Sequence, residues 1–165
     1  MKKLFLIRHA KSSWDSHAQS DIERPLNNRG EQNALMMSKI LMKENILPEL
    51  LLSSPALRAL STAKIFAGQF GIDQETIVIE KSIYEAGIRE LSIIVDGIDD
   101  RYDSVFLFGH NPGLSAFTNL IGDKFIPEMP TCAIAGLEFN INRWSKVARG
   151  AGRLFLFDYP KKHSK

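Results

Sequence analysis

The stretch Lys3-Leu4-Phe5-Leu6-Ile7-Arg8-His9 places four consecutive apolar residues directly before an arginine and a histidine. Similar apolar runs occur at residues 50–53 and 104–110, and the chain turns polar at the end of each run. Runs that are apolar at every position, rather than at every second one, are typical of strands buried on both faces of a parallel sheet. These three segments are therefore predicted to be buried strands of a parallel sheet.

Helical patterns separate the predicted strands. Between residues 28 and 44, apolar side chains recur at spacings of three and four, which indicates an amphipathic helix capped by the asparagine at position 27 or 28. Ser54-Pro55 is expected to be the N-cap and first residue of the next helix, which ends near residues 68–71. The remaining expected elements are a strand at 76–80, helices at 88–98 and 112–121, and strands at 137–141 and 153–158. The alternating pattern of the strand at 137–141 predicts one less buried face.

The alternation of strands and helices indicates an α/β fold. A length of 165 residues corresponds to one domain, so residues 1–160 are expected to form a single compact domain. The last five residues, 161–165, contain three lysines and are expected to be a flexible basic tail.

Charge and cysteine content exclude several classes of function. The chain has 21 Lys and Arg against 19 Asp and Glu; without the three lysines of the last five residues, 18 basic residues face 19 acidic ones, a net charge of −1. Such a body lacks the basic field of a nucleic-acid-binding protein. The single cysteine, Cys132, excludes an internal disulfide and is expected to be a small buried residue. No apolar stretch approaches the roughly 18 residues of a membrane span, so a cytoplasmic protein without a membrane partner is expected.

Polar residues follow three of the predicted strands: Arg8-His9, Ser53-Ser54 leading to Arg58, and Gly109-His110. Ligands of open α/β sheets bind outside the carboxyl ends of the strands, so two histidines and two arginines are expected to converge there. Arginine pairs with phosphate oxygens in a bidentate manner, and an imidazole can attack phosphorus. The sequence has no Walker-type loop for a nucleoside triphosphate, no cluster of aspartates for magnesium, and no metal-ligand spacing of its histidines. The simplest chemistry is a metal-free transfer of a phosphoryl group to water, with no cofactor.

Four motifs then resemble those of a known family: Arg8-His9-Ala10, Arg24-Pro25-Leu26-Asn27-Asn28-Arg29-Gly30, Ser53-Ser54-Pro55-Ala56-Leu57-Arg58-Ala59-Leu60-Ser61-Thr62-Ala63 and Gly109-His110-Asn111-Pro112. Their types and order resemble the histidine phosphatase superfamily. The short chain and the segment Thr131-Cys132-Ala133-Ile134-Ala135 are similar to its SixA-like phosphohistidine phosphatase branch. This resemblance implies a three-layer α/β/α architecture with a central, mostly parallel sheet, like that of phosphoglycerate mutase.

The resemblance also implies roles for individual residues. His9 would be the nucleophile that carries the phosphoryl group, and Arg8 and Arg58 would clamp its oxygens. His110 would donate to an oxygen as charge builds in the transition state. A backbone carbonyl that accepts from one ring nitrogen of His9 would leave the other free to attack. Ser12 could offer its hydroxyl or its backbone N–H to the phosphate.

The sequence departs from the family pattern at two points. Ala10 replaces the usual glycine, a small change that we expect the site to tolerate. The general acid of larger relatives has no certain counterpart: Glu85 is the natural candidate, with a solvated loop carboxylate as its alternative, and Asp15 and Asp21 are weaker candidates. Such an acid is commonly worth about 10²–10⁴-fold in rate.

The expected function is a phosphatase that acts on phosphohistidine in a protein. Phosphohistidine releases an imidazole, which needs less help from an acid than an alcohol does. The chain also lacks an insertion large enough for a lid domain, so a protein-borne phosphate should reach the site. Two alternatives stay open: a phosphatase of small phosphate esters, and a phosphate-binding adaptor without catalytic activity.

Overall fold

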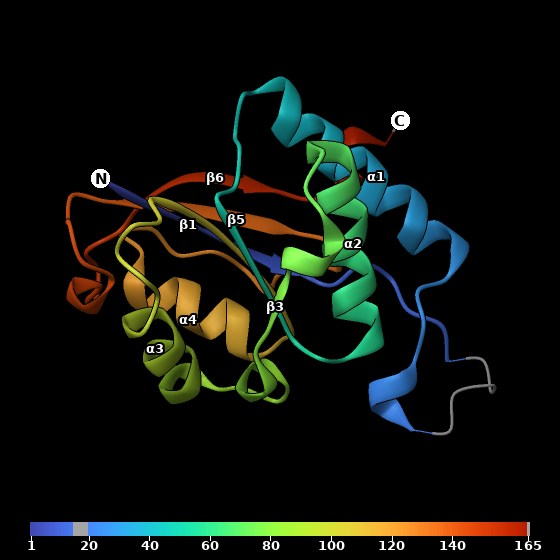
Figure 1. Ribbon diagram of the computed structural model, residues 1–165, viewed down its shortest axis with the longest axis horizontal. Coiled ribbons are helices and arrows are strands. Elements are labelled where there is room, and N and C mark those ends of the chain that lie inside the picture. Colours follow the sequence, from blue (N-terminus) through green and yellow to red (C-terminus); the bar gives the residue numbers. More distant parts are fainter. Residues whose placement is uncertain (15–19, 165) are drawn as a thin grey trace.

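Over residues 1–14 and 20–164, which the computed structural model describes, six strands form one sheet in the order β3-β2-β4-β1-β5-β6 (Figure 1). Their bounds are β1 Lys2–Arg8, β2 Leu50–Ser53, β3 Val78–Ile79, β4 Ser104–Gly109, β5 Ile134–Phe139 and β6 Arg153–Asp158. The pairs β2–β3, β2–β4 and β1–β4 are parallel, whereas β5 runs antiparallel to both β1 and β6. All strands except β5 therefore point the same way, and the predicted mostly parallel sheet is confirmed.

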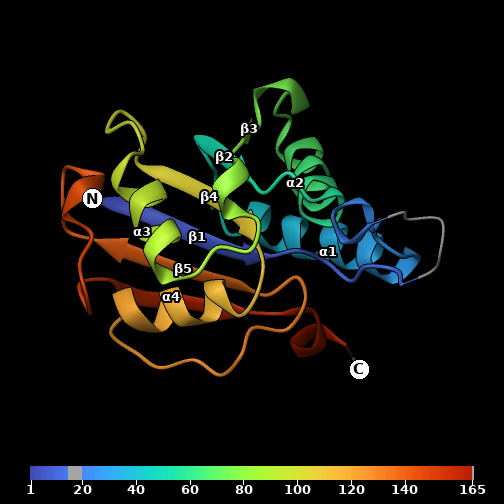
Figure 2. The ribbon, with the colours of Figure 1, turned by 90° about the horizontal axis from the view of Figure 1, so that it is seen from below.

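Helices cover both faces of this sheet. Figures 1 and 2 show α1 (Asn28–Lys43) and α2 (Leu57–Phe70) together on one side, and α3 (Ile88–Asp96) and α4 (Gly113–Ile121) together on the other. Short 3₁₀ helices occupy the connections: η1 Asp21–Glu23, η2 Gln74–Thr76, η3 Lys81–Ile83, η4 Trp144–Lys146 and η5 Pro160–His163. The three-layer α/β/α architecture is confirmed. Within the described ranges, no helix combines the length and the apolar character that crossing a membrane requires.

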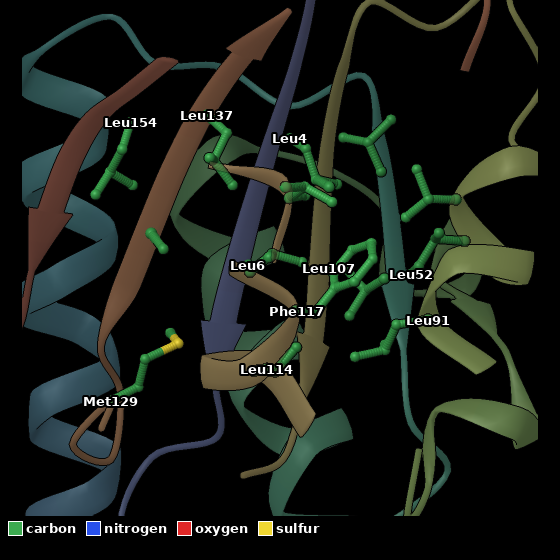
Figure 3. Packing of buried hydrophobic residues seen from close by; sticks show 14 of the residues in the cluster. Leu4, Leu6, Leu52, Leu91, Leu107, Leu114, Phe117, Met129, Leu137 and Leu154 are labelled. Carbon is green, nitrogen blue, oxygen red and sulfur yellow. The ribbon is translucent and has the colours of Figure 1, made fainter. Parts of the chain in front are cut away.

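Strand β1 shows why continuous apolar runs form the centre of this fold. Leu4 and Leu6 pack into the core beneath α3 and α4, whereas Phe5 and Ile7 pack into the core beneath α1 and α2. All four side chains are 0% exposed. Figure 3 shows Leu4 and Leu6 beside side chains of β4 and α4. Full burial of such a side chain contributes about 1.5–3 kcal/mol, so both faces of β1 hold the layers together.

The predicted start of α2 is wrong. Ser54-Pro55 was expected to cap and begin this helix, but Ala56 is the N-cap and the helix begins at Leu57. The Ser54 hydroxyl accepts from the Ala56 N–H at 3.1 Å and contacts a ring nitrogen of His110 at 2.8 Å. A tertiary partner therefore uses the hydroxyl that the sequence pattern assigned to a helix cap.

The predicted strand at 137–141 is also displaced. The strand β5 covers Ile134–Phe139, and every residue in it is buried except the half-buried Glu138. The strand β5 lies inside the sheet, between β1 and β6, and its burial pattern shows that neither face is left to solvent. The alternation that predicted a less buried face reflects only Glu138, whose carboxylate pairs with Arg153.

Other boundaries lie close to the predictions. Asn27 caps α1, with its side chain accepting from the Gly30 N–H at 2.8 Å, and Gly71 ends α2 in the left-handed conformation at a φ of 68°. The strand predicted at 76–80 shortens to β3, the helix at 88–98 ends at Asp96, and the strand at 153–158 is β6. Cys132 is fully buried, and burial raises the pKa of its thiol to about 12, which fits the expected packing role.

Candidate active site

Three strands of the sheet end level with one another at the edge where the polar motifs begin. Arg8 at the end of β1 is in register with Gly109 at the end of β4, and Ser53 of β2 is in register with Phe108. The next residues continue this contact, because the His9 N–H donates to the Gly109 carbonyl at 3.0 Å. The topology therefore brings residues about 100 positions apart to one edge.

A cavity of about 340 Å³ opens at this edge. Its lining residues are Arg8, His9, Lys11, Ser12, Trp14, Arg24, Arg58, His110, Asn111 and Thr131. We refer to it as the histidine cavity. It contains Ser12 and the two arginines and two histidines expected from the sequence. Its described lining includes four cationic side chains and no acidic one, so it favours an anion.

His9 lies in the histidine cavity as a neutral imidazole with a defined tautomer. Its side chain is buried, and its Nδ1 donates to the Ala10 carbonyl at 2.7 Å. A carbonyl can only accept, so the proton is on Nδ1 and Nε2 keeps its lone pair. Burial lowers the pKa of His9 to about 4, and the positive charges of Arg58 and Arg8 add to this effect. The expected hydrogen bond to a backbone carbonyl is thus confirmed, and the acceptor is the carbonyl of the next residue.

Ala10 fits without strain where the family has glycine. It is not among the residues with positive φ, so its backbone conformation is open to any residue. Its N–H donates to the Thr62 hydroxyl at 3.0 Å, and that hydroxyl donates to the Arg58 carbonyl at 2.7 Å. Thr62 is 0% exposed and lies one turn after Arg58 on α2. It therefore links the backbone beside His9 to the helix that carries Arg58, a role that the sequence analysis did not assign.

The guanidinium of Arg58 is held by η1. Its Nη1 donates to the Asp21 backbone carbonyl at 2.8 Å and its Nη2 to the Asp21 carboxylate at 3.0 Å. The same carboxylate accepts from the Tyr84 hydroxyl at 2.6 Å and from Arg24 at 3.0 Å. These bonds, that of Tyr84 above all, hold the pKa of Asp21 well below its usual range. Asp21 is therefore an ionised positioning group with no proton to donate near neutral pH, which argues against its weak candidacy as general acid.

Arg8 is anchored to the connection between α4 and β5. Its Nη1 donates to the Met129 carbonyl at 2.8 Å, and the Asn111 side-chain amide donates to the same oxygen at 2.8 Å. Ser115 completes this contact, since its hydroxyl donates to Asn111 and accepts from the Met129 N–H. The buried Nε of Arg8 has no hydrogen-bond partner among the described residues, so one donor of the guanidinium remains available.

His110 is a second neutral imidazole beside the first. Its ring centre lies 5.3 Å from that of His9 and 5.6 Å from that of Tyr84, whose ring is nearly perpendicular to it. Burial, followed by the proximity of His9 and Arg58, lowers the pKa of His110 to about 3. Its Nε2 contacts the Ser54 hydroxyl at 2.8 Å, while its buried Nδ1 has no partner in the described part of the chain.

Arg24 and Trp14 form one wall of the histidine cavity. The guanidinium carbon of Arg24 lies 3.4 Å from the centre of the Trp14 ring, and its nitrogens donate to the Ser12 hydroxyl and the Ser13 carbonyl. The Ser12 hydroxyl thus accepts a hydrogen bond from Arg24, and Ser12 still lines the histidine cavity. Arg24 belongs to one of the four family-like motifs, but its place in this wall could not be predicted from the sequence, because it depends on these contacts.

The remaining acidic candidate does not line the histidine cavity. Glu85 is exposed, has a φ of 60°, and follows Tyr84, whose ring contacts His110. Asp15 lies outside the described residues. Within those residues, no three His, Cys, Asp or Glu side chains form a group that could hold a metal ion.

The model of the histidine phosphatase superfamily (branch 1) matches residues 4–93, more than half of the chain. The chain belongs to the histidine phosphatase superfamily. Among curated relatives of this chain, an uncharacterised chloroplastic protein of Arabidopsis thaliana is 29% identical over 88% of this chain and 70% of its own length. A 2,3-bisphosphoglycerate-dependent phosphoglycerate mutase of Bifidobacterium longum is 35% identical, but over only 38% of this chain and 26% of the mutase.

The solved structures that are similar to this chain include SixA proteins. A SixA protein of Agrobacterium tumefaciens shares 29% identity and a TM-score of 0.74 over 96% of this chain and 98% of that one. The protein histidine phosphatase SixA in complex with tungstate shares the fold, with a TM-score of 0.83 at 21% identity over 98% of this chain and 99% of that one. The predicted SixA-like resemblance is confirmed, and the enzyme class is that of a phosphatase.

Proposed function

We propose that this phosphatase removes the phosphoryl group from phosphohistidine in a protein, through a covalent phosphohistidine intermediate on His9. The observation that carries the proposal is the tautomer of His9. The Ala10 carbonyl holds the proton on Nδ1 and leaves the lone pair on Nε2, inside a cavity lined by four cations. A neutral imidazole beside a site for a tetrahedral anion is suited to attack phosphorus.

The reaction consists of two displacements. The Nε2 of His9 attacks phosphorus, and the P–N bond to the substrate imidazole breaks with its electron pair moving to the leaving nitrogen, which takes a proton from solvent. Water then attacks phosphorus, the P–Nε2 bond breaks, and inorganic phosphate leaves while His9 regains its neutral form. The low pKa of about 4 keeps His9 unprotonated and ready to attack at neutral pH.

Arg8, Arg58 and His110 would hold the phosphoryl oxygens during both steps. The Nε of Arg8 has no partner among the described residues, and it is a donor that Arg8 would offer to the phosphoryl group. When the Ser54 hydroxyl donates to Nε2 of His110, the ring proton is on Nδ1, where it can donate to an oxygen. Such charge-assisted bonds are worth about 1.5–3 kcal/mol each, and they strengthen as negative charge builds on the oxygens.

Phosphohistidine is the proposed substrate because the site offers little help to an alkoxide leaving group. Glu85 lies outside the lining of the histidine cavity, and Asp21 is held in its ionised form. An imidazole is a better leaving group than an alkoxide, so breaking the P–N bond depends less on a positioned general acid. The similarity to a SixA protein that is proposed to be a phosphohistidine phosphatase supports the same substrate class.

The intermediate is tested by exposing the protein briefly to phosphoramidate and measuring its intact mass at neutral pH. We expect one phosphoryl group on the wild type, none on His9→Ala, and one on the control His163→Ala. A label that persists in His9→Ala would refute the mechanism. Binding of phosphate without label or turnover would favour the adaptor.

The substrate class is tested by comparing a phosphohistidine peptide with a panel of phosphomonoesters, for the wild type and for Glu85→Gln. We expect the peptide to be preferred and Glu85→Gln to change its turnover less than tenfold. If esters are turned over far faster than the peptide, and Glu85→Gln abolishes that activity, the protein is a small-ester phosphatase in which Glu85 is the general acid.

A further inference from the structure

A second cavity, of about 410 Å³, lies next to the histidine cavity. Its lining residues are Lys11, Arg29, Asn33, Met36, Pro130, Thr131, Pro160, Lys161 and Ser164. We call it the basic cavity. Lys11 and Thr131 line both cavities, so the two cavities are adjacent. A molecule whose phosphoryl group occupies the first can therefore reach the second.

The charge of the basic cavity is uncompensated. It contains three cationic side chains and, in its described lining, no acidic one. Elsewhere Lys2, Arg58 and Arg153 form ion pairs, but within residues 1–14 and 20–164 Lys11, Arg29 and Lys161 form none. Cations gathered in a hollow repel one another and raise the local concentration of anions. The polar side chains of Asn33, Thr131 and Ser164 add hydrogen-bonding groups, and Met36 and two prolines add apolar wall.

The fold fixes the segments that carry these cations. The Lys11 carbonyl accepts from the Asn27 N–H at 3.0 Å, and it lies so close to α1 that a Cβ at Gly30 would be 2.1 Å from it. Arg29 is in the first turn of α1, where the helix dipole adds positive potential. The segment of Lys161 was expected to belong to a flexible tail, but Pro160–His163 forms η5, in which Lys162 donates to the Phe157 carbonyl at 2.9 Å and His163 contacts the Asp158 carboxylate at 2.8 Å.

We propose that the basic cavity binds an acidic side chain of the substrate protein while the phosphohistidine of that protein occupies the histidine cavity. This inference rests on the proposed function and adds a sequence preference to it. The carboxylate would pair with Arg29 and Lys161, and its methylene groups would contact Met36 and the prolines. Acidic residues near the phosphohistidine are therefore the feature that the enzyme selects.

The test compares three substrates: free phosphohistidine, a phosphohistidine peptide with glutamates on both sides, and the same peptide with alanines. For the wild type, we expect kcat/KM to be about tenfold higher for the glutamate peptide, through KM, which is the effect of one charge-assisted hydrogen bond. In Arg29→Glu and Lys161→Glu this preference should disappear or reverse. Both side chains are exposed, and glutamate in the first turn of a helix is favourable, so these variants are expected to fold.

The matched control is Lys146→Glu, which makes the same change in net charge at the opposite edge of the sheet. Lys146 belongs to η4, whose Trp144 contacts Lys2 at the start of β1. We expect this variant to keep the preference. An equal loss in Lys146→Glu, or equal kcat/KM for the two peptides in the wild type, would overturn the basic cavity as a substrate site.

Two further measurements distinguish this inference from binding of a small carboxylate-bearing molecule and from failure of the proposed function. If Arg29→Glu changes turnover of O-phosphoserine but not the ratio between the peptides, the cavity binds a small phosphorylated acid instead of a protein side chain. If the wild type hydrolyses neither free phosphohistidine nor either peptide, the proposed function fails, whereas hydrolysis of both peptides with equal kcat/KM refutes only the basic cavity.

Discussion

At the scale of single residues, the site depends on hydrogen bonds that set proton positions. The Ala10 carbonyl fixes the tautomer of His9, and the Thr62 hydroxyl in turn fixes the Ala10 backbone. The residue that holds the tautomer of the proposed nucleophile, His9, is thus positioned by a buried side chain that is not expected to touch the substrate. The Thr62 hydroxyl does this by accepting a hydrogen bond from the Ala10 N–H while it donates one to the Arg58 carbonyl.

We predict that Thr62→Val lowers both stability and turnover. Valine has the shape of threonine but leaves the buried Ala10 N–H without an acceptor, which costs about 1–3 kcal/mol of unfolding free energy. Because the Ala10 carbonyl then loses its fixed place, kcat should fall more than KM changes. Urea denaturation and steady-state kinetics measure the two effects. Thr62→Ser restores the hydroxyl and should recover most of both, whereas an unaffected kcat in Thr62→Val would show that the bond has only a structural role.

At the scale of elements, the short helix η1 connects segments that are remote in sequence. Through Asp21 it contacts α2 at Arg58 and the end of η3 at Tyr84. It also places a negative charge against a guanidinium that is proposed to bind phosphate. Asp21 therefore aligns Arg58 and at the same time reduces the positive potential of the histidine cavity.

We predict that Asp21→Asn binds inorganic phosphate more tightly. Asparagine keeps the backbone carbonyl and a side-chain oxygen for Arg58, but it removes the charge. In a solvent-exposed setting one unit charge is worth about 1 kcal/mol at 4 Å, so product inhibition should strengthen by about fivefold or less. The inhibition constant for phosphate measures this. Tyr84→Phe, which keeps the charge of Asp21, is the control, and weaker phosphate inhibition in Asp21→Asn would mean that alignment outweighs charge.

The sequence predicted the elements that depend on local patterns, and it did not predict the features that depend on contacts between distant residues. Continuous apolar runs and a helical period depend on local residues, so β1, β2, β4 and α1 were predicted within one or two residues of their bounds. The predicted start of α2 was wrong because the Ser54 hydroxyl contacts His110, which lies 56 positions away in the sequence. The contacts of Asp21 with Arg58 and Tyr84 span 37 and 63 positions and carry no local pattern. Arg8, His9, Arg58 and His110 could be placed at one edge, because the carboxyl ends of parallel strands share an edge.

At the scale of the whole molecule, the fold concentrates positive charge that the composition hides. The net charge of the chain is +2, yet four cations line the histidine cavity and three line the basic cavity, with Lys11 in both. Among these cations lie two imidazoles, of which His9 is buried and His110 half-buried. Folding therefore moves two histidines from water to a place where a proton is unfavourable, which couples the protonation of the site to the stability of the entire domain.

We predict that the folded state loses stability as the pH falls from about 6.5 to about 4. In the unfolded chain both histidines titrate near a pKa of 6.5, whereas folding lowers the pKa of His9 to about 4 and that of His110 to about 3. Between these values the unfolded state binds more protons, so stability is fully present above the unfolded value and declines below it. Each histidine contributes up to about 3 kcal/mol to this decline. Urea midpoints measured from pH 7.5 to 4 should show it, and they should change less in His9→Asn and His110→Asn than in the wild type. An identical pH dependence in all three proteins would show that folding does not lower the pKa of either histidine, which contradicts this prediction.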